Sequence, residues 1–160
     1  TVVSPVNQML CEPLAAKRRP SSPINAKFSI PYAVSAAIHY GTVSLDHFQP
    51  EALGDDEVLR TAAKFSYEVD HTMGLKDTLR GYTEIRTKDR VFRTVVDAPY
   101  GDPGKPLGLD DLIAKFTACA RHAAYPHSER QLDHLVNCIL NLESIEDIRK
   151  LTALLQAQPD

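Results

Sequence analysis

Three residues near the start of an apolar helical segment carry groups that can hold and polarise a carboxylate. They are Lys27, Ser29 and Tyr32, in the stretch "INAKFSIPYAVSAAIHYG" from Ile24 to Gly41. The N-terminus of a helix presents backbone N–H groups and a partial positive charge to an anion. Lys27 adds a cation, and the Tyr32 hydroxyl can donate a hydrogen bond or relay a proton. Because helix starts attract polar residues anyway, the alternative is that Tyr32 packs in a core with its hydroxyl satisfied while Lys27 lies in solvent.

The other residues with chemical potential form no recognised catalytic or metal-binding pattern. The chain has no GxSxG turn for a serine nucleophile and no GxxxxGK[ST] phosphate loop. Its three cysteines, Cys11, Cys119 and Cys138, lack CxxC or CxxH spacing, and its six histidines are scattered. His39, near the end of the apolar helical segment, is more typical of a satisfied histidine than of a catalyst. We therefore expect no metal site.

Composition argues against two classes of partner. The formal net charge of −3 and the sequence pI near 6.0 provide no general field for attracting nucleic-acid phosphates. A hydrophobic content of 43% with 24% charged residues is typical of a globular protein. No apolar run approaches the roughly 20 residues needed to cross a bilayer, and the start has no signal-like pattern. We expect a soluble, cytoplasmic protein that binds neither nucleic acid nor membrane.

Local signals define the helix that positions the candidate residues. Ser29 is a predicted N-cap, Pro31 falls in the first turn, and Gly41 supplies the stop. Ala and Val side chains leave little polar surface around the segment, which favours a central helix packed on more than one side. A further helix opens at Asp55 and is predicted to end near Asp70.

The remaining segments predict a few strands among helices. Two alternating runs, Tyr82–Thr87 and Val91–Val96, predict a β-hairpin, whereas the prolines between residues 12 and 23 favour an ordered loop. A capping box starts a helix after Ser128, and another helix is predicted from Ser144. Few strands with segregated helices favour an α+β fold with a small, mostly antiparallel sheet packed with helices. The length of 160 residues fits a single domain spanning the whole chain.

Four segments, spread over nearly the whole chain, resemble segments of a known protein family. They are "CEPLAAKRRP", "AKFSIPYAVSAAIHYG", "PYGDPGKPLGLDDLIAKF" and "NLESIEDIRKLTALL". In this order and at these separations they resemble the C-terminal domain of the MmgE/PrpD family, which includes 2-methylcitrate dehydratase, cis-aconitate decarboxylase and iminodisuccinate epimerase. The resemblance implies a large N-terminal helical domain, a smaller α+β domain like this one, and a homodimer without metal or organic cofactor.

The resemblance also implies a function for the whole protein and a role for the corner around Ser29. The family acts beside a carboxylate in a small di- or tricarboxylic acid, by dehydration, decarboxylation or epimerisation. Its key His, Asp and Lys residues belong to the helical domain, so we expect this chain to be a C-terminal fragment that is inactive without that domain. Tyr32 is the expected catalytic residue, and Lys27 and Ser29 are the expected substrate-binding residues. The alternative is a stand-alone binding or dimerisation module without catalysis.

Overall fold

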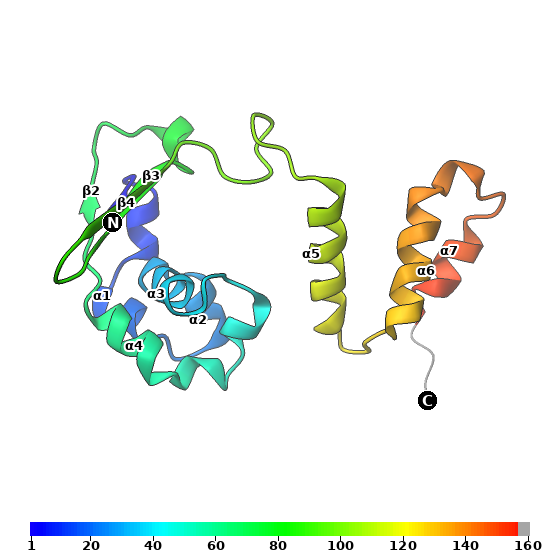
Figure 1. Cartoon of the computed structure of the whole chain (residues 1–160), viewed down its shortest axis with the longest axis horizontal. Helices are drawn as coiled ribbons and strands as arrows, with labels where there is room; N and C mark the ends of the chain where they lie inside the picture. The colour runs from blue at the N-terminus through cyan, green and yellow to red at the C-terminus, as the bar shows by residue number, and fades with distance from the viewer. Residues whose placement is uncertain (157–160) are drawn as a thin grey trace. The chain divides into compact units, whose positions relative to one another are not determined.

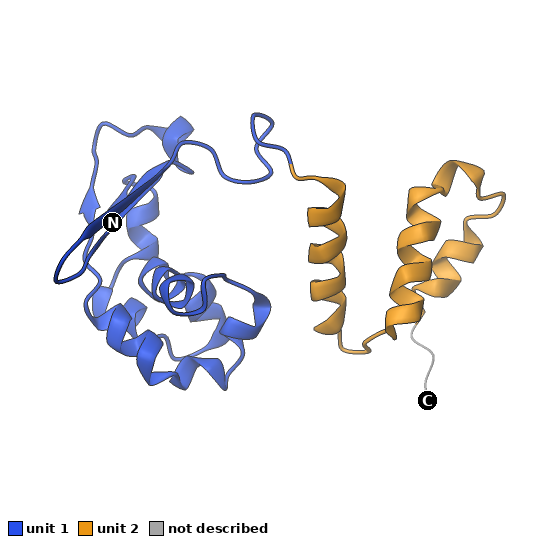
Figure 2. Ribbon diagram, viewed as in Figure 1, with its two compact units in different colours: residues 1–106 blue, residues 107–160 orange. Residues whose placement is uncertain are grey.

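The computed structural model describes residues 1–156. The chain divides into two compact units, residues 1–106 and residues 107–160, which Figure 2 distinguishes by colour. The first unit holds all the strands of the sheet and the helical segment that carries the candidate residues. The described part of the second unit consists of helices and the loops that join them, without a strand. A single domain over the whole chain stays a prediction.

The sheet of the first unit joins the start of the chain to the predicted hairpin (Figure 1). Its strand order is β2 (Glu68–Val69), β1 (Val2–Val3), β3 (Gly81–Arg86) and β4 (Val91–Val96). β1 pairs in parallel with β2 and antiparallel with β3, and β3 pairs antiparallel with β4. A small, mostly antiparallel sheet packed with helices confirms the predicted α+β class.

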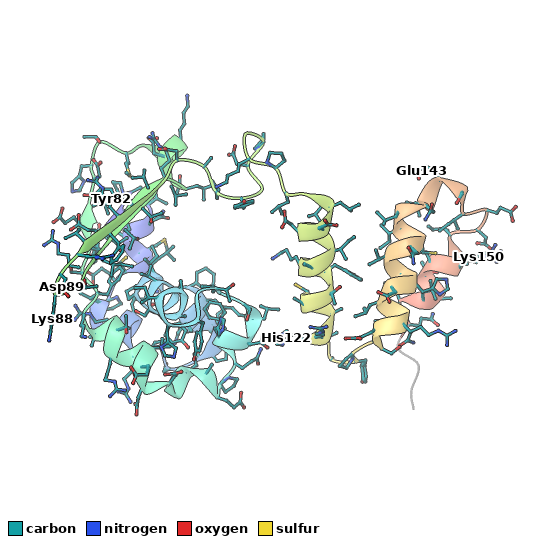
Figure 3. The ribbon with its side chains drawn as sticks, in the orientation of Figure 1. Tyr82, Lys88, Asp89, His122, Glu143 and Lys150 are labelled. Atoms are coloured by element: carbon teal, nitrogen blue, oxygen red, sulfur yellow. The ribbon has the colours of Figure 1, made fainter. Side chains whose placement is uncertain are left out.

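The hairpin occupies the predicted segments, and β3 begins one residue earlier than the alternation indicates. Its register runs from the pair Gly81↔Val96 to the pair Arg86↔Val91. Next to the last pair, the Thr87 N–H donates to the Arg90 carbonyl at 2.9 Å. The intervening Lys88 and Asp89 lie at the tip of the hairpin (Figure 3).

The helices of the first unit surround α3, the helix predicted to be central. Residues 12–23 were expected to form a loop, but helical turns form at both ends of this segment. Each proline there lies outside or at the first position of a helix, where its missing N–H costs nothing. The α-helices are α1 (Leu14–Arg18), α2 (Pro23–Lys27), α3 (Ile30–Tyr40) and α4 (Asp56–Ala63), and the 3₁₀ turns are η1 (Asn7–Leu10), η2 (Leu45–Phe48), η3 (Ala52–Gly54) and η4 (Leu75–Asp77).

The signals at the two ends of α3 act as predicted. The Ser29 side chain caps the helix by accepting the Tyr32 N–H at 3.1 Å. Gly41 ends the helix with φ of 72°, a left-handed conformation that glycine adopts without steric cost. The helix contributes to two core clusters, which agrees with the prediction that it packs on more than one side. One cluster contains Tyr32, Ala36 and Val58, and the other centres on Val3, Cys11 and Phe65, with Ile30 and Val34 of α3 packed against it.

The helix that opens at Asp55 is shorter than predicted. It ends at Ala63, and the chain then turns so that Phe65 enters the core cluster that contains Val3. Residues 68–69 form β2 instead of a last helical turn, because they pair with β1. The apolar spacing that suggested a continuous helix therefore reflects two elements: Val58 of α4 belongs to the core cluster of Tyr32, and Val69 of β2 packs against the cluster of Val3.

The second unit contains α5 (Leu109–Arg121), α6 (Glu129–Leu140), the 3₁₀ turn η5 (Leu142–Ser144) and α7 (Arg149–Leu154). The predicted capping box is present at the start of α6, where the Ser128 hydroxyl and the Gln131 side chain satisfy each other's backbone N–H groups. The last helix begins at Arg149 and not at Ser144, because a 3₁₀ turn ends at that serine.

Candidate functional site

The Ser29 side chain uses its hydrogen-bonding capacity inside the first unit. Its hydroxyl accepts the Tyr32 N–H and donates to the Lys17 carbonyl, and the residue is only 2% exposed. The cap therefore both starts α3 and fixes α1 against it. This position accounts for the serine by structure alone, and a role in binding substrate stays a prediction.

The Tyr32 side chain is also buried and hydrogen-bonded within the first unit. The residue is 1% exposed, and its hydroxyl lies 2.9 Å from the His47 carbonyl and 3.1 Å from the Ala52 carbonyl. A phenol has one proton, so the two carbonyls share it. Burial raises the pKa of the Tyr32 phenol, and the negative charge of Asp55 raises it further. This geometry gives Tyr32 the structural role of fastening the segment with η2 and η3 to α3, and a catalytic role stays a prediction that requires the hydroxyl to leave these carbonyls.

Lys27 differs from the other two predicted site residues because its side chain is exposed. It lies in the last turn of α2, two residues before the Ser29 cap. Among residues 1–156, no hydrogen bond or ion pair engages its ammonium group. By contrast, two other cations donate to backbone carbonyls, Lys17 to that of Phe28 and Arg18 to that of Phe65. Lys27 is therefore a cation that remains available for an anion next to the start of α3.

A cluster of ionisable side chains at the far end of α3 escaped the sequence analysis. The Tyr40 hydroxyl donates a short hydrogen bond to the Asp55 carboxylate. The Tyr40 ring stacks on the His47 ring with centroids 4.2 Å apart, and it meets the edge of the His39 ring at 4.7 Å. His47 Nδ1 accepts the Ser44 N–H at 3.0 Å, so the neutral ring carries its proton on Nε2.

Hydrogen bonding within this cluster shifts two acidities in opposite directions. The bond to Asp55 raises the pKa of Tyr40 to about 12. The same bond lowers the pKa of Asp55, helped by the backbone N–H groups of Val58 and Glu57 that Asp55 caps at the start of α4. The sequence analysis singled out only His39 of this cluster, because the contacts among its members depend on the loop that joins α3 to α4.

The first unit also contains a cleft of about 480 Å³ between the sheet and the helices α3 and α4. This volume is in the range of small-molecule sites. Four charged residues line it, two cations and two acids: Lys64, Glu68, Glu84 and Arg86. Arg86 is paired with Glu84 at 2.6 Å. None of Lys27, Ser29 and Tyr32 lines the cleft, so the structure places the predicted corner and the cleft on different sides of α3.

Residues 1–156 offer neither a metal cluster nor a membrane-spanning helix. No group of three or more His, Cys, Asp or Glu side chains in this part of the chain is arranged to hold a metal ion. No helix in the same part is both long and apolar enough to cross a membrane.

Comparison with known proteins identifies the family to which this chain belongs. Residues 2–141 match the MmgE/PrpD C-terminal domain, which shows that the chain belongs to the MmgE/PrpD family. It is 30% identical over 152 residues to a cis-aconitate decarboxylase-like protein, oryM, of Aspergillus oryzae, an alignment that covers 90% of this chain and 30% of that protein. It is 29% identical over 140 residues to the cis-aconitate decarboxylase of Mus musculus, covering 86% of this chain and 28% of that enzyme. The chain thus spans less than a third of the length of these relatives.

Proposed function

We propose that this chain is the C-terminal domain of a cofactor-free lyase or isomerase that acts beside a carboxylate in a small di- or tricarboxylic acid. The reaction is a dehydration, a decarboxylation or an epimerisation, carried out by a cytoplasmic homodimer. The observation that carries the proposal is the family match over residues 2–141, together with two relatives named for cis-aconitate decarboxylase. A decarboxylase-like reaction is the first to test, because both relatives are so named.

Such a reaction needs a base for the C–H proton or an acid for a leaving group, and cations that hold the carboxylates. In the first unit, Lys27 offers an exposed cation beside the start of α3. The other two residues of that corner are buried and bonded to the backbone. We therefore propose that Lys27 binds a substrate carboxylate and that most reacting groups come from an N-terminal helical domain of the longer protein.

The second unit presents a surface suited to that domain. A groove of about 270 Å³ between α5 and α6 is lined entirely by apolar side chains: Leu109, Leu112, Ile113, Phe116, Val136, Ile139 and Leu140. Within the described part of this unit, only Leu132 and Leu135 are buried. So small a core gives little stability by itself. Because the relatives are more than three times as long as their aligned parts, we propose that the N-terminal domain covers this groove.

The test is turnover by the longer protein, followed by NMR with cis-aconitate, 2-methylcitrate and related acids as substrates. Loss of CO₂, loss of water or inversion at the carbon beside a carboxylate supports the proposal. In the same protein, Lys27→Gln should raise KM with little change in kcat, because the cation binds the substrate and does not react. Lys76→Gln, at another lysine with an exposed side chain, is the matched control. Equal KM values for the two variants would remove Lys27 from the site.

The second candidate is a stand-alone binding or dimerisation module without catalysis. The observation in its favour is that Tyr32 and Ser29, the other members of the predicted corner, already have partners within the first unit. A longer protein that binds di- or tricarboxylic acids without converting any of them would establish this alternative and reject the enzyme.

A further inference from the structure

The cleft in the first unit coincides with a gap in the sheet. β1 lies between β2 and β3, because Val2 pairs with Glu68 on one side and with Tyr82 on the other. β3 continues past Tyr82 as far as Arg86, beyond the point where β1 has a residue to pair with it. Residues 82–86 line one side of the cleft and residues 64–68 line the other. The cleft therefore lies where earlier residues of β1 would run.

Thr1 already makes the hydrogen bonds of a strand residue. Its nitrogen donates to the Ser66 carbonyl at 3.0 Å, and its carbonyl accepts the Glu68 N–H at 2.9 Å. These two bonds have the pattern of a parallel pair, in which one residue bonds to the two residues that flank its partner. On the other side, Thr1 Oγ1 lies 3.3 Å from Thr83 Oγ1. Thr1 is thus in register with both neighbours, and a residue attached to its nitrogen would enter the cleft.

Both walls of the cleft present backbone groups that a strand can bond. Hydrogen-bonded and non-hydrogen-bonded pairs alternate along antiparallel strands, and the bond from Thr87 N–H to the Arg90 carbonyl fixes this alternation between β3 and β4. Glu84 and Arg86 therefore turn their N–H and C=O groups away from β4, toward the cleft. On the opposite wall, no hydrogen bond within residues 1–156 engages the Ser66 N–H.

We propose that the three residues directly before Thr1 in the longer protein fill the cleft as an extension of β1. The geometry favours this segment over any other occupant, because it enters in line with β1 and keeps both bonds that Thr1 makes. In the register of β1, the three residues lie opposite Glu84, Ile85 and Arg86. At a rise of about 3.4 Å per residue they span about 10 Å.

Strand alternation also predicts the side chain at one position of this segment. Val3 faces the core packed against α3, and residues at every second position along a strand share a face. Thr1 and the second residue before it therefore point to the same side as Val3. The second residue before Thr1 would cover Ile38 of α3, which lines the cleft and is 44% exposed. We expect an apolar residue there, and a charged residue at this position would overturn the proposal.

The extension of β1 requires only that the longer protein proposed above continues before Thr1, and it does not depend on the reaction. The first test is a disulfide in that longer protein between a cysteine at the second residue before Thr1 and Ile85→Cys. Directly opposite residues of a non-hydrogen-bonded pair have Cα atoms about 4.5 Å apart, within the disulfide range of about 4.4–6.8 Å. Mild oxidation should link the two cysteines, which mass spectrometry of the digested protein detects.

Two other cysteine pairs serve as matched controls. Thr1→Cys with Thr83→Cys should form a disulfide, because the native hydroxyls lie 3.3 Å apart. The cysteine at the second residue before Thr1 should not link to Thr83→Cys, which is a diagonal neighbour about 7–8 Å away. No link to Ile85→Cys, or an equal link to Thr83→Cys, would overturn the proposal.

The second test is hydrogen exchange of the unmodified longer protein, measured by mass spectrometry. The protection factors of the three residues before Thr1 should be at least about tenfold higher than those of Lys88 and Asp89 at the hairpin tip, because strand amides are hydrogen-bonded. Equal protection would leave the cleft open to another occupant, such as a small molecule, and would overturn the proposal. A longer protein with this protection that converts no carboxylic acid would reject the proposed function and leave the extension of β1 standing.

Discussion

The Tyr32 hydroxyl provides a sharp prediction, because stability and catalysis respond to its loss in different ways. Tyr32→Phe removes one buried hydroxyl and leaves the ring in place. The His47 and Ala52 carbonyls then lose the donor that they share at 2.9 and 3.1 Å. Leaving a buried acceptor without its donor costs about 1–3 kcal/mol. Since Tyr32 is 1% exposed, water cannot readily replace the phenol, and we expect a loss near the middle of this range.

The assay is urea and thermal unfolding of the 160-residue chain, monitored by circular dichroism. A loss of about 2 kcal/mol corresponds to a fall in Tm of several degrees for a protein of this size. The control is Tyr67→Phe, whose hydroxyl bonds to the Glu12 carboxylate in an exposed position. This control should shift the unfolding midpoint much less than Tyr32→Phe, as for other exposed side-chain contacts. An unfolding curve for Tyr32→Phe that overlays the wild type would refute the structural role.

The same substitution in the longer protein addresses the catalytic role of Tyr32. If the hydroxyl only fastens the segment with η2 and η3, turnover at a temperature well below unfolding should be unchanged. A fall in kcat without a matching loss of stability would instead show that the phenol leaves its two carbonyls and reaches the substrate.

Three further predictions concern the ends and the surroundings of α3. Tyr40→Phe should be less stable than the wild type at neutral pH, and the difference in stability should shrink between pH 10 and about 12. The pKa of the Tyr40 phenol is raised from 10.0 to about 12 in the folded protein. Its stabilising effect is therefore complete below pH 10 and is lost as the phenol ionises. A difference in urea midpoints that stays constant through pH 12 would contradict this. Gly41→Ala should lower the free energy of unfolding by roughly 1–2 kcal/mol, because alanine is strained at φ of 72°; an unchanged Tm would contradict the left-handed cap. Ser29→Ala should cost about 1 kcal/mol or somewhat more, since the hydroxyl both caps α3 and donates to the Lys17 carbonyl, and a Ser29→Ala protein as stable as the wild type would remove both roles.

Local signals in the sequence were sufficient to predict the elements whose ends depend on neighbouring residues. The Ser29 cap, the Gly41 stop and the capping box at Ser128 act within one turn, and the hairpin follows from alternation. The α+β class followed from the order of these elements. The end of α4 could not be predicted in this way, because residues 68–69 leave the helical pattern in order to pair with β1, which lies more than sixty positions earlier in the sequence.

The surroundings of the candidate residues were harder to predict than the helix itself. Whether Tyr32 faces a cleft or a core depends on the path of residues 44–55. Two carbonyls of this segment accept the hydrogen bond of the Tyr32 hydroxyl. The same loop creates the cluster of Tyr40, His47 and Asp55, which come from separate elements and have no common spacing in the sequence. The surroundings of Lys27 were easier to predict, because an exposed lysine at a helix end needs no tertiary partner.

We propose that this chain supplies one part of a carboxylic-acid lyase or isomerase whose reacting groups lie mostly elsewhere in a longer protein. The most direct measurement compares cis-aconitate turnover by the 160-residue chain, by the longer protein, and by the chain mixed with the separately produced remainder of that protein. We expect no turnover by the chain alone, turnover by the longer protein, and recovery of turnover in the mixture. Turnover by the 160-residue chain at the rate of the longer protein would contradict it.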